Sequence, residues 1–221
     1  MKLTKEMIST DIAKYVEKIT YINSCIEVYD YLSASRVLYN NEMNIAPAFF
    51  GMTMSAMART IVLESSKLFD MNSDKNIDKL LKCCENNKKM FGEELIRREL
   101  VDVDGVERVI KTSEKINLNE VIIDLRNEYD NLSATICKIK HQRDKVLAHA
   151  DKKYFYDNKK MSAENPISIN EFKVLMEYAL KVCNLFNNML NDGKTFRGIY
   201  ANVGDIENLF DALQRNSANH N

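Results

Sequence analysis

Residues 4–29 read TKEMISTDIAKYVEKITYINSCIEVY, and an apolar side chain recurs in this stretch at every third or fourth position. This spacing places the apolar side chains on one face of an α-helix about six turns long. Thr4 precedes the first turn and is a residue type that caps helices. The stretch therefore predicts a long amphipathic helix, whose apolar positions are Ile8, Ile12, Tyr15, Ile19, Ile22, Ile26 and Tyr29.

The composition extends this expectation to the whole chain. Only 6 glycines and 2 prolines occur among 221 residues, so few turns can be formed and the elements between them must be long. With 45% hydrophobic and 29% charged residues, the chain can bury a core. We expect an all-α helical bundle with four or more long helices and a short C-terminal helix. Residues 1–215 are expected to form a single domain, and residues 216–221 a frayed tail.

Apolar spacing and capping residues place the other helices. A helix is expected from Pro47, and the next is expected to follow a cap at Ser73 or Asp74 and to run on as far as Arg98. The later helices are expected over residues 118–147, capped by Asn117 or Asn119, over 169–190, opened by a Ser168–Glu171 capping box, and over 205–215. Residues 100–106 contain Asp-Gly flanked by valines, which is a hairpin signal. Since an isolated two-stranded hairpin is marginal, we interpret this segment as a turn.

Several classes of protein are disfavoured. The five cysteines are odd in number and lack C-x-x-C spacing, which favours buried, reduced thiols over disulfides or zinc. No apolar run approaches the roughly 18 residues that a membrane span needs, and no apolar leader follows the first residues. We therefore expect a cytoplasmic protein that does not enter a membrane and uses no metal or other cofactor.

One arginine interrupts an apolar stripe. The fourth long helix carries Leu125, Tyr129, Leu132, Ile136 and Ile139, and the next position of the stripe is Arg143. Burying an unpaired guanidinium costs several kcal/mol. Arg143 must therefore extend to solvent, form an ion pair, or face an anionic ligand.

The surroundings of Arg143 are basic. Residues 138–160 contain eight lysines and arginines against three aspartates, in a chain whose net charge is −1. His149 lies six residues after Arg143, and a histidine's ordinary pKa of about 6.5 suits proton transfer. A basic segment can be a solvated face, or it can bind RNA with aromatic side chains stacking on bases. The candidate RNA-binding residues are Lys140, Lys145, Lys152, Lys153 and Tyr154.

Residues 143–151, RDKVLAHAD, resemble the signature of the HEPN superfamily, in which an arginine is followed by a histidine after four to six residues. The Arg-Asp-Lys-x-x-Ala-His-x-Asp form, together with residues 64–70, ESSKLFD, is similar to the abortive-infection U-type branch. This resemblance implies an all-α bundle and a metal-independent endoribonuclease of a toxin–antitoxin or phage-defence system. It also implies a homodimer in which each copy gives one arginine and one histidine to a shared cleft.

The residue types suggest roles in such a site. His149 would be the general acid or base, and Arg143 would bind the phosphate and the charge of the transition state. Asp144 could orient an arginine or histidine of a partner copy, and Asp151 could hold the imidazole tautomer. Six residues correspond to about 9 Å and about 600° of helical rotation, so Arg143 and His149 do not share one face of an ideal helix. A second copy across a two-fold axis would bring both types together.

Some alternatives remain open from the sequence. The same motif can serve a catalytically silent module that binds RNA or protein, and Glu64 can pair with Arg143. In the superfamily branch paired with nucleotidyltransferase antitoxins, a modified tyrosine follows two residues after the histidine. Here that position is Asp151, so any antitoxin partner is expected to be of another type.

Overall fold

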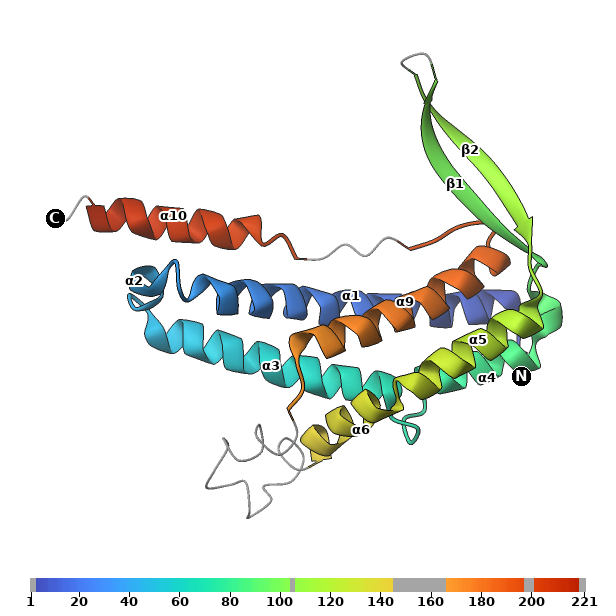
Figure 1. The fold of residues 1–221 in the computed structure, drawn as a ribbon, viewed down its shortest axis with the longest axis horizontal. Coiled ribbons are helices and arrows are strands. Elements are labelled where there is room, and N and C mark those ends of the chain that lie inside the picture. Colours follow the sequence, from blue (N-terminus) through green and yellow to red (C-terminus); the bar gives the residue numbers. More distant parts are fainter. Residues whose placement is uncertain (1–2, 104–105, 145–165, 197–200, 219–221) are drawn as a thin grey trace. The chain divides into compact units, whose positions relative to one another are not determined.

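The computed structural model describes residues 3–103, 106–144, 166–196 and 201–218. Within these residues the chain is predominantly helical, as the sequence predicted, with one antiparallel hairpin as its sheet (Figure 1). The elements in chain order are α1 (Lys5–Ser35), α2 (Asn40–Met43), α3 (Pro47–Phe69), α4 (Ile77–Asn86), a 3₁₀ turn η1 (Lys88–Met90), β1 (Glu94–Val103), β2 (Val106–Lys115), α5 (Leu118–Asn131), α6 (Ser133–Gln142), α9 (Ile169–Leu190) and α10 (Gly204–Ala218).

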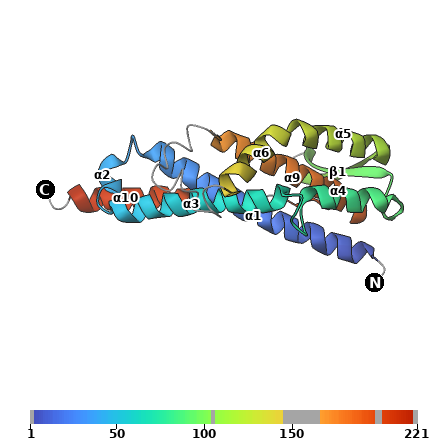
Figure 2. The same cartoon turned by 90° about the horizontal axis from the view of Figure 1, so that it is seen from below.

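The residues group into two compact units. Unit 1 comprises Met1–Ile19, Lys67–Ile136 and Glu177–Gly198, and unit 2 comprises Thr20–Ser66, Cys137–Met176 and Ile199–Asn221. The long helices α1, α3 and α9 contribute residues to both units, as the continuous ribbons of Figures 1 and 2 show.

Helix α1 begins where the sequence predicted. The backbone N–H of Met7 donates to Thr4 Oγ1 at 3.3 Å, which satisfies one of the free donors of the first turn. The isoleucines of the predicted stripe are at most 1% exposed. The opposite face of the helix presents polar side chains to solvent. Burial of this stripe, rather than intrinsic helix propensity, supplies most of the helix's stability.

In unit 1, hydrogen bonds join α1 to the cap of α4 and to the end of α9, and join α9 to α5. Buried tyrosines place their hydroxyls on backbone carbonyls: Tyr15 donates to Asn76 O at 3.1 Å, and Tyr178 donates to Leu125 O at 2.9 Å. Burial raises the pKa of both phenols well above its ordinary value. Both hydroxyls therefore stay protonated, as donors to those carbonyls must be.

The cap of α4 corrects one prediction. Asn76, not Ser73 or Asp74, accepts the N–H of Lys79 at 2.8 Å. Asn76 Nδ2 also donates to the carbonyls of Asp70 and Ser73 at 2.7 and 3.1 Å, so a single amide closes the whole turn before α4. A serine or aspartate could cap the helix but could not donate these additional bonds.

The third predicted helix also ends earlier than expected, since α4 stops at Asn86 and residues 94–103 form strand β1 instead of continuing to Arg98. Strand β1 pairs antiparallel with β2, with Glu94 opposite Lys115 and Val103 opposite Val106. The Asp-Gly hairpin signal was therefore the correct indication, and the interpretation of residues 100–106 as a turn alone was wrong. The helical spacing of Phe91 and Leu95 extended the predicted helix too far, and pairing with the adjacent segment 106–115 makes residues 94–103 a strand.

The long helix predicted over 118–147 is interrupted. Asn117 caps α5 by accepting the N–H of Asn119 at 3.1 Å, but α5 ends at Asn131 and α6 begins at Ser133. At the junction the N–H of Leu132 lies 3.3 Å from Glu128 O and 3.1 Å from Tyr129 O. The side chains of asparagine and serine compete for backbone hydrogen bonds, so an Asn-Leu-Ser sequence is a weak point in a helix.

Unit 2 has its own core around α10. Leu32, Met43, Phe50 and Met54 are buried together with Phe210, which is completely buried. The ring of Phe210 stacks on Tyr39 with centroids 4.4 Å apart. Helix α10 extends to Ala218, three residues beyond the predicted end at Arg215.

The five cysteines are all free thiols, as expected. Three of them, Cys25, Cys84 and Cys183, are buried as predicted. Cys137 is exposed and Cys83 is partly exposed, so the expectation of burial was wrong for Cys137.

The turn after α9 requires glycine for two reasons. Gly193 has φ of 81°, in the left-handed region that favours glycine. A Cβ at this position would lie 2.5 Å from Ile96 Cγ2, because the side chain of Ile96 on β1 packs directly onto the glycine. The turn therefore fixes the base of the hairpin against the end of α9.

We expect Gly193→Ala to destabilise the fold by about 2–4 kcal/mol, through left-handed backbone strain together with the overlap at Ile96. Urea unfolding followed by circular dichroism measures this change. Gly92→Ala is the matched control, because its added Cβ would lie 3.6 Å from Met189 O, an ordinary contact. Equal stability of the two variants would show that the turn does not support the fold in this way.

Candidate functional site

Arg143 follows the last residue of α6 and lies with Asp144 in a π-helical turn. Wide turns of this type are rare and are frequent at functional sites. The side chain of Arg143 is 19% exposed, consistent with its place in an apolar stripe whose preceding member, Ile139, is 1% exposed. Arg143 is thus a partly buried cation, at a position where the sequence left open solvent exposure, an ion pair or an anionic ligand.

The charge of Arg143 is balanced by its neighbour. Asp144 Oδ1 accepts a hydrogen bond from Nε at 2.7 Å and lies 2.6 Å from Nη2 in an ion pair, and the carboxylate of Asp144 is 42% exposed. This contact joins residues of one chain, whereas the sequence suggested Asp144 as a partner for an arginine or histidine of a second copy. It holds one edge of the guanidinium fork in a defined orientation.

The remaining motif residues fall outside the described part of the chain. They are His149, Asp151, Lys145, Lys152, Lys153 and Tyr154. Of the candidate RNA-binding residues, Lys140 is described and is exposed on α6. The arrangement of Arg143 and His149 therefore stays a prediction.

Two ion pairs position the first turns of α9 within unit 2. Lys138 Nζ on α6 lies 2.7 Å from Glu171 Oε1, and Lys173 Nζ lies 2.6 Å from Asp30 Oδ2 on α1. The start of α9 is thus joined to α6 on one side and to α1 on the other. Because Lys138 precedes Arg143 by five residues, this joint also fixes the end of α6 that carries the arginine.

Glu171 has two functions in this joint. Its Oε2 accepts the backbone N–H of Ser168 at 2.8 Å, and its own N–H donates to Ser168 Oγ at 3.3 Å, which is the predicted capping box. Its Oε1 binds Lys138. The hydrogen bond from Lys138, followed by the one from the backbone of Ser168, lowers the pKa of the Glu171 carboxyl below its ordinary value.

The second segment of the motif lies on α3. Glu64 is partly buried there, and its suggested pairing with Arg143 stays a prediction. The next residue, Ser65, is completely buried, and its Oγ has no hydrogen-bond partner among the described residues. An unsatisfied buried hydroxyl costs about 1–3 kcal/mol. Ser66 differs, because its Oγ donates to Leu63 O at 2.8 Å.

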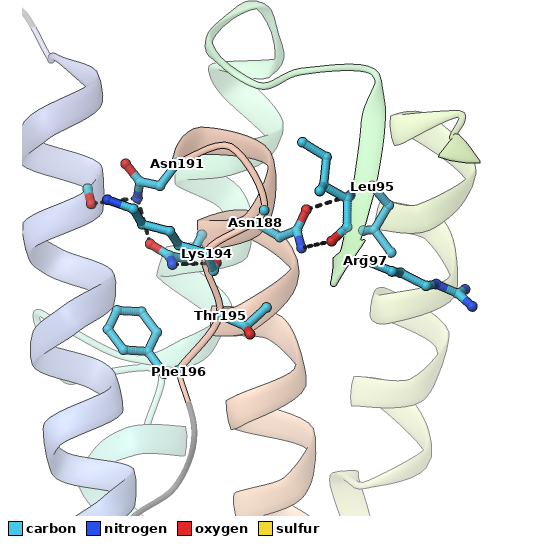
Figure 3. Close-up of a pocket in the computed structure, with 11 residues that line it drawn as sticks. Leu95, Arg97, Asn188, Asn191, Lys194, Thr195 and Phe196 are labelled. Carbon is cyan, nitrogen blue, oxygen red and sulfur yellow. Dashed lines mark hydrogen bonds between the residues drawn. The ribbon is translucent and has the colours of Figure 1, made fainter. Parts of the chain in front are cut away.

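Unit 1 contains a groove of about 890 Å³ between the base of β1 and residues 193–196 (Figure 3). Asparagines of α9 bind the backbone of both segments that line this groove. Asn188 accepts the N–H of Ile96 at 2.9 Å and donates to its carbonyl at 2.6 Å. Asn184 makes the same pair of bonds with Phe196, at 2.7 and 3.1 Å.

The other asparagines of this helix continue the network. Asn191 donates to Asn187 Oδ1 at 2.7 Å and lies 2.9 Å from Ser9 Oγ on α1, and Asn187 donates to Lys194 O at 2.7 Å. Sequence analysis missed this set, although its spacing of three and four residues places it on one helix face. These amides replace a neighbouring strand, and their role is structural.

Comparison with known protein families identifies the family of the chain. A model of the HEPN_AbiU2 family, described as AbiU2, matches residues 10–209 of the chain. None of the curated proteins or solved structures compared with the chain matches it. Among the helices that the structure describes, none combines the length and apolarity of a membrane-spanning segment.

The lowered pKa of Glu171 predicts a pH-dependent contribution to stability. Its ionised form stabilises the fold above the unfolded-state pKa of about 4.3, and this stabilisation is lost as the pH falls through the lower folded-state pKa. At pH 7 we expect Glu171→Gln, which can still accept the Ser168 bond, to lower the thermal midpoint by about 2–4 °C.

The difference between the two proteins should shrink as the pH is lowered from 7 to 3, because protonation removes the charge of Glu171. Thermal unfolding by circular dichroism at both pH values measures this difference. Glu177→Gln, an exposed residue of the same helix, is the control and should match the wild type throughout. A Glu171→Gln effect of equal size at both pH values would contradict the ionic role of this carboxylate.

Proposed function

The chain belongs to the HEPN_AbiU2 family, and from this premise we propose that it is a metal-independent endoribonuclease of a phage-defence or toxin-like system. The observation that carries the proposal is Arg143, a partly buried cation at the end of α6 inside the matched region. The cleaved bond is expected to lie in a cleft shared by two copies of the chain, and the protein to act in the cytoplasm.

In this RNA cleavage the ribose supplies the nucleophile, so the protein has to supply only proton transfer and stabilisation of the charge on the phosphate. The 2′-oxygen of a ribose attacks the adjacent phosphorus and loses its proton to a base, and the 5′-oxygen leaves and takes up a proton. The products are a 2′,3′-cyclic phosphate and a free 5′-hydroxyl. Two histidines in a shared cleft, one His149 from each copy, would serve as base and acid.

Arg143 would stabilise the phosphate during this reaction. The planar guanidinium can donate two parallel hydrogen bonds to phosphate oxygens, and these bonds strengthen as negative charge grows in the transition state. The contact with Asp144 supports this role, because it restricts the rotation of the guanidinium before RNA binds. Asp151 would hold the imidazole of His149 in the required tautomer.

RNA is the expected ligand of the basic residues around the motif. Lys140 is exposed one turn before Arg143 and is available to an RNA phosphate. Lys145, Lys152 and Lys153 would add further phosphate contacts, and Tyr154 would stack on a base. An antitoxin protein of a type unrelated to nucleotidyltransferases would complete the system.

One contact favours a second candidate, a catalytically silent module that binds RNA or protein. The Nε and Nη2 groups of Arg143 are already engaged by Asp144 of the same chain, and a phosphate approaching that edge must compete with a carboxylate. In this alternative the Arg143–Asp144 pair would stabilise the end of α6 and have no role in chemistry.

Cleavage of a labelled RNA pool in EDTA tests the proposal. We expect the wild type to cut RNA and leave 2′,3′-cyclic phosphate ends, and Arg143→Ala and His149→Ala to lower the rate by at least about 100-fold. The matched controls are Arg215→Ala and His141→Ala. They remove the same residue types from an exposed site on α10 and a partly exposed site on α6, and should retain full activity.

The opposite result is equally informative. Absence of cutting by a folded, dimeric wild type that binds RNA as well as its variants do would reject the nuclease and support the silent module. Cutting that disappears in EDTA and returns with Mg²⁺ would reject the metal-independent mechanism.

A further inference from the structure

A second cavity of unit 1 lies between the η1 turn and the start of α5. Its volume is about 780 Å³, within the range of cavities that bind small ligands. Lysines from separate elements line it, since Lys88 and Lys89 belong to η1 and Lys115 is the last residue of β2. We call this space the lysine cavity. It shares no lining residue with the groove at the base of β1.

The charges of these lysines are not balanced within the part of the chain that the structure describes. Lys88 Nζ donates to Asn119 Oδ1 at 2.6 Å, and this partner is neutral. Neither Lys89 nor Lys115 pairs with a carboxylate of the described residues, although Glu94 lies opposite Lys115 in the hairpin. Three lysines against Glu93 give the lining a net charge of +2, in a chain whose net charge is −1.

This concentration of positive charge favours an anion in the cavity. A cleft lined by one sign of charge focuses the electrostatic potential and raises the local concentration of counter-ions. Phe91 is 7% exposed and makes part of the lining apolar. Apolar groups beside the lysines lower the local dielectric constant and so strengthen their attraction for an anion.

A smaller basic cavity of unit 1 provides a contrast. Lys14, Lys18 and Lys75 line it, but its volume is about 170 Å³, below the usual range of ligand cavities. Asp11 lines the same cavity and forms an ion pair with Lys75, so one of the three charges is already neutralised. The lysine cavity has both the larger volume and the unpaired charges.

The lining also indicates the chemical class of the anion. Each ammonium group binds phosphate oxygens as a point charge and can donate three hydrogen bonds. Three such groups around one cavity match the several charges of a condensed phosphate better than the single charge of a carboxylate. Asn119 can add a donor through Nδ2, since its side chain lines the cavity and its oxygen is bound by Lys88.

We propose that the lysine cavity binds a di- or triphosphate group, with Lys88, Lys89 and Lys115 on the phosphate oxygens. The contact with Asn119 holds Lys88 in place before the anion arrives. The group can belong to a free inorganic polyphosphate or to the 5′-triphosphate end of an RNA. Binding requires no catalysis, so this inference does not rest on the proposed nuclease activity.

Isothermal titration calorimetry of the full chain with sodium tripolyphosphate tests the site. At low salt we expect one saturable ligand per chain, and weaker binding of orthophosphate because it carries fewer charges. The double variant Lys89→Gln/Lys115→Gln should weaken tripolyphosphate binding at least about tenfold, because two of the three charges are removed. Both lysines are exposed and make no side-chain contact with the described residues, so the thermal midpoint should stay unchanged.

The matched control is the double variant Lys14→Gln/Lys18→Gln, which removes two exposed lysines beside the smaller cavity of the same unit. It should bind tripolyphosphate as the wild type does. Equal affinities of the two double variants would show that binding follows the overall charge, and would overturn the inference. The absence of saturable binding by the folded wild type would do the same.

A further titration distinguishes the two sources of the phosphate. Short 2′-O-methyl RNAs lack the nucleophile and stay uncut, and they can carry a 5′-triphosphate or a 5′-hydroxyl. A preference of at least about tenfold for the triphosphate end, lost in Lys89→Gln/Lys115→Gln, would assign the site to RNA ends. Equal binding of the two RNAs, beside specific binding of tripolyphosphate, would assign it to free polyphosphate.

These measurements separate this inference from the proposed function, because none of them uses RNA cleavage. A chain that binds tripolyphosphate in the lysine cavity but cuts no RNA keeps this inference and rejects the nuclease. A chain that cuts RNA but does not bind tripolyphosphate does the reverse.

Discussion

The apolar stripe of α1 is the constraint on which the rest of the fold depends. Its isoleucines contribute to the cores of both units, with Ile8 and Ile12 in unit 1 and Ile22 and Ile26 in unit 2, and each is at most 1% exposed. Every other helix of a unit must present an apolar face to this stripe or to a neighbour that does. A continuous stripe on a single 31-residue helix lets one element supply both cores without an intervening turn. Glycine and proline are therefore rare along the chain.

The hairpin of β1 and β2 needs hydrogen-bond partners for the backbone of its edge, which the packing of apolar helix faces cannot supply. A two-stranded sheet leaves an edge whose backbone groups need partners, and an isolated hairpin is marginally stable. The chain meets both needs with α9, where Asn188 occupies the edge of β1 at Ile96 and Gly193 receives the side chain of Ile96. An asparagine amide carries a donor and an acceptor side by side, as a neighbouring strand does, and can take the place of one residue of that strand.

The sequence predicted those helix ends that depend only on neighbouring residues. The Thr4 cap, the start of α3 at Pro47 and the Ser168–Glu171 capping box all depend on residues a few positions apart. The hairpin depends on pairing between residues 94–103 and 106–115 and on asparagines some 90 residues away, so the helical spacing of residues 77–95 was misleading. The break at Leu132 was missed because the apolar stripe continues across it. The interruption of the apolar stripe at Arg143 identified this residue from the sequence. Its contact with Asp144 and the ion pair between Lys138 and Glu171 depend on three-dimensional packing.

A shared site would bring the end of α6 of each copy to one cleft. Each copy would bring an arginine whose orientation is already fixed by Asp144, so little side-chain entropy is lost when a phosphate binds between the copies. Activity would then vary with the square of the chain concentration at levels below the dimer dissociation constant, because two chains are needed for one site.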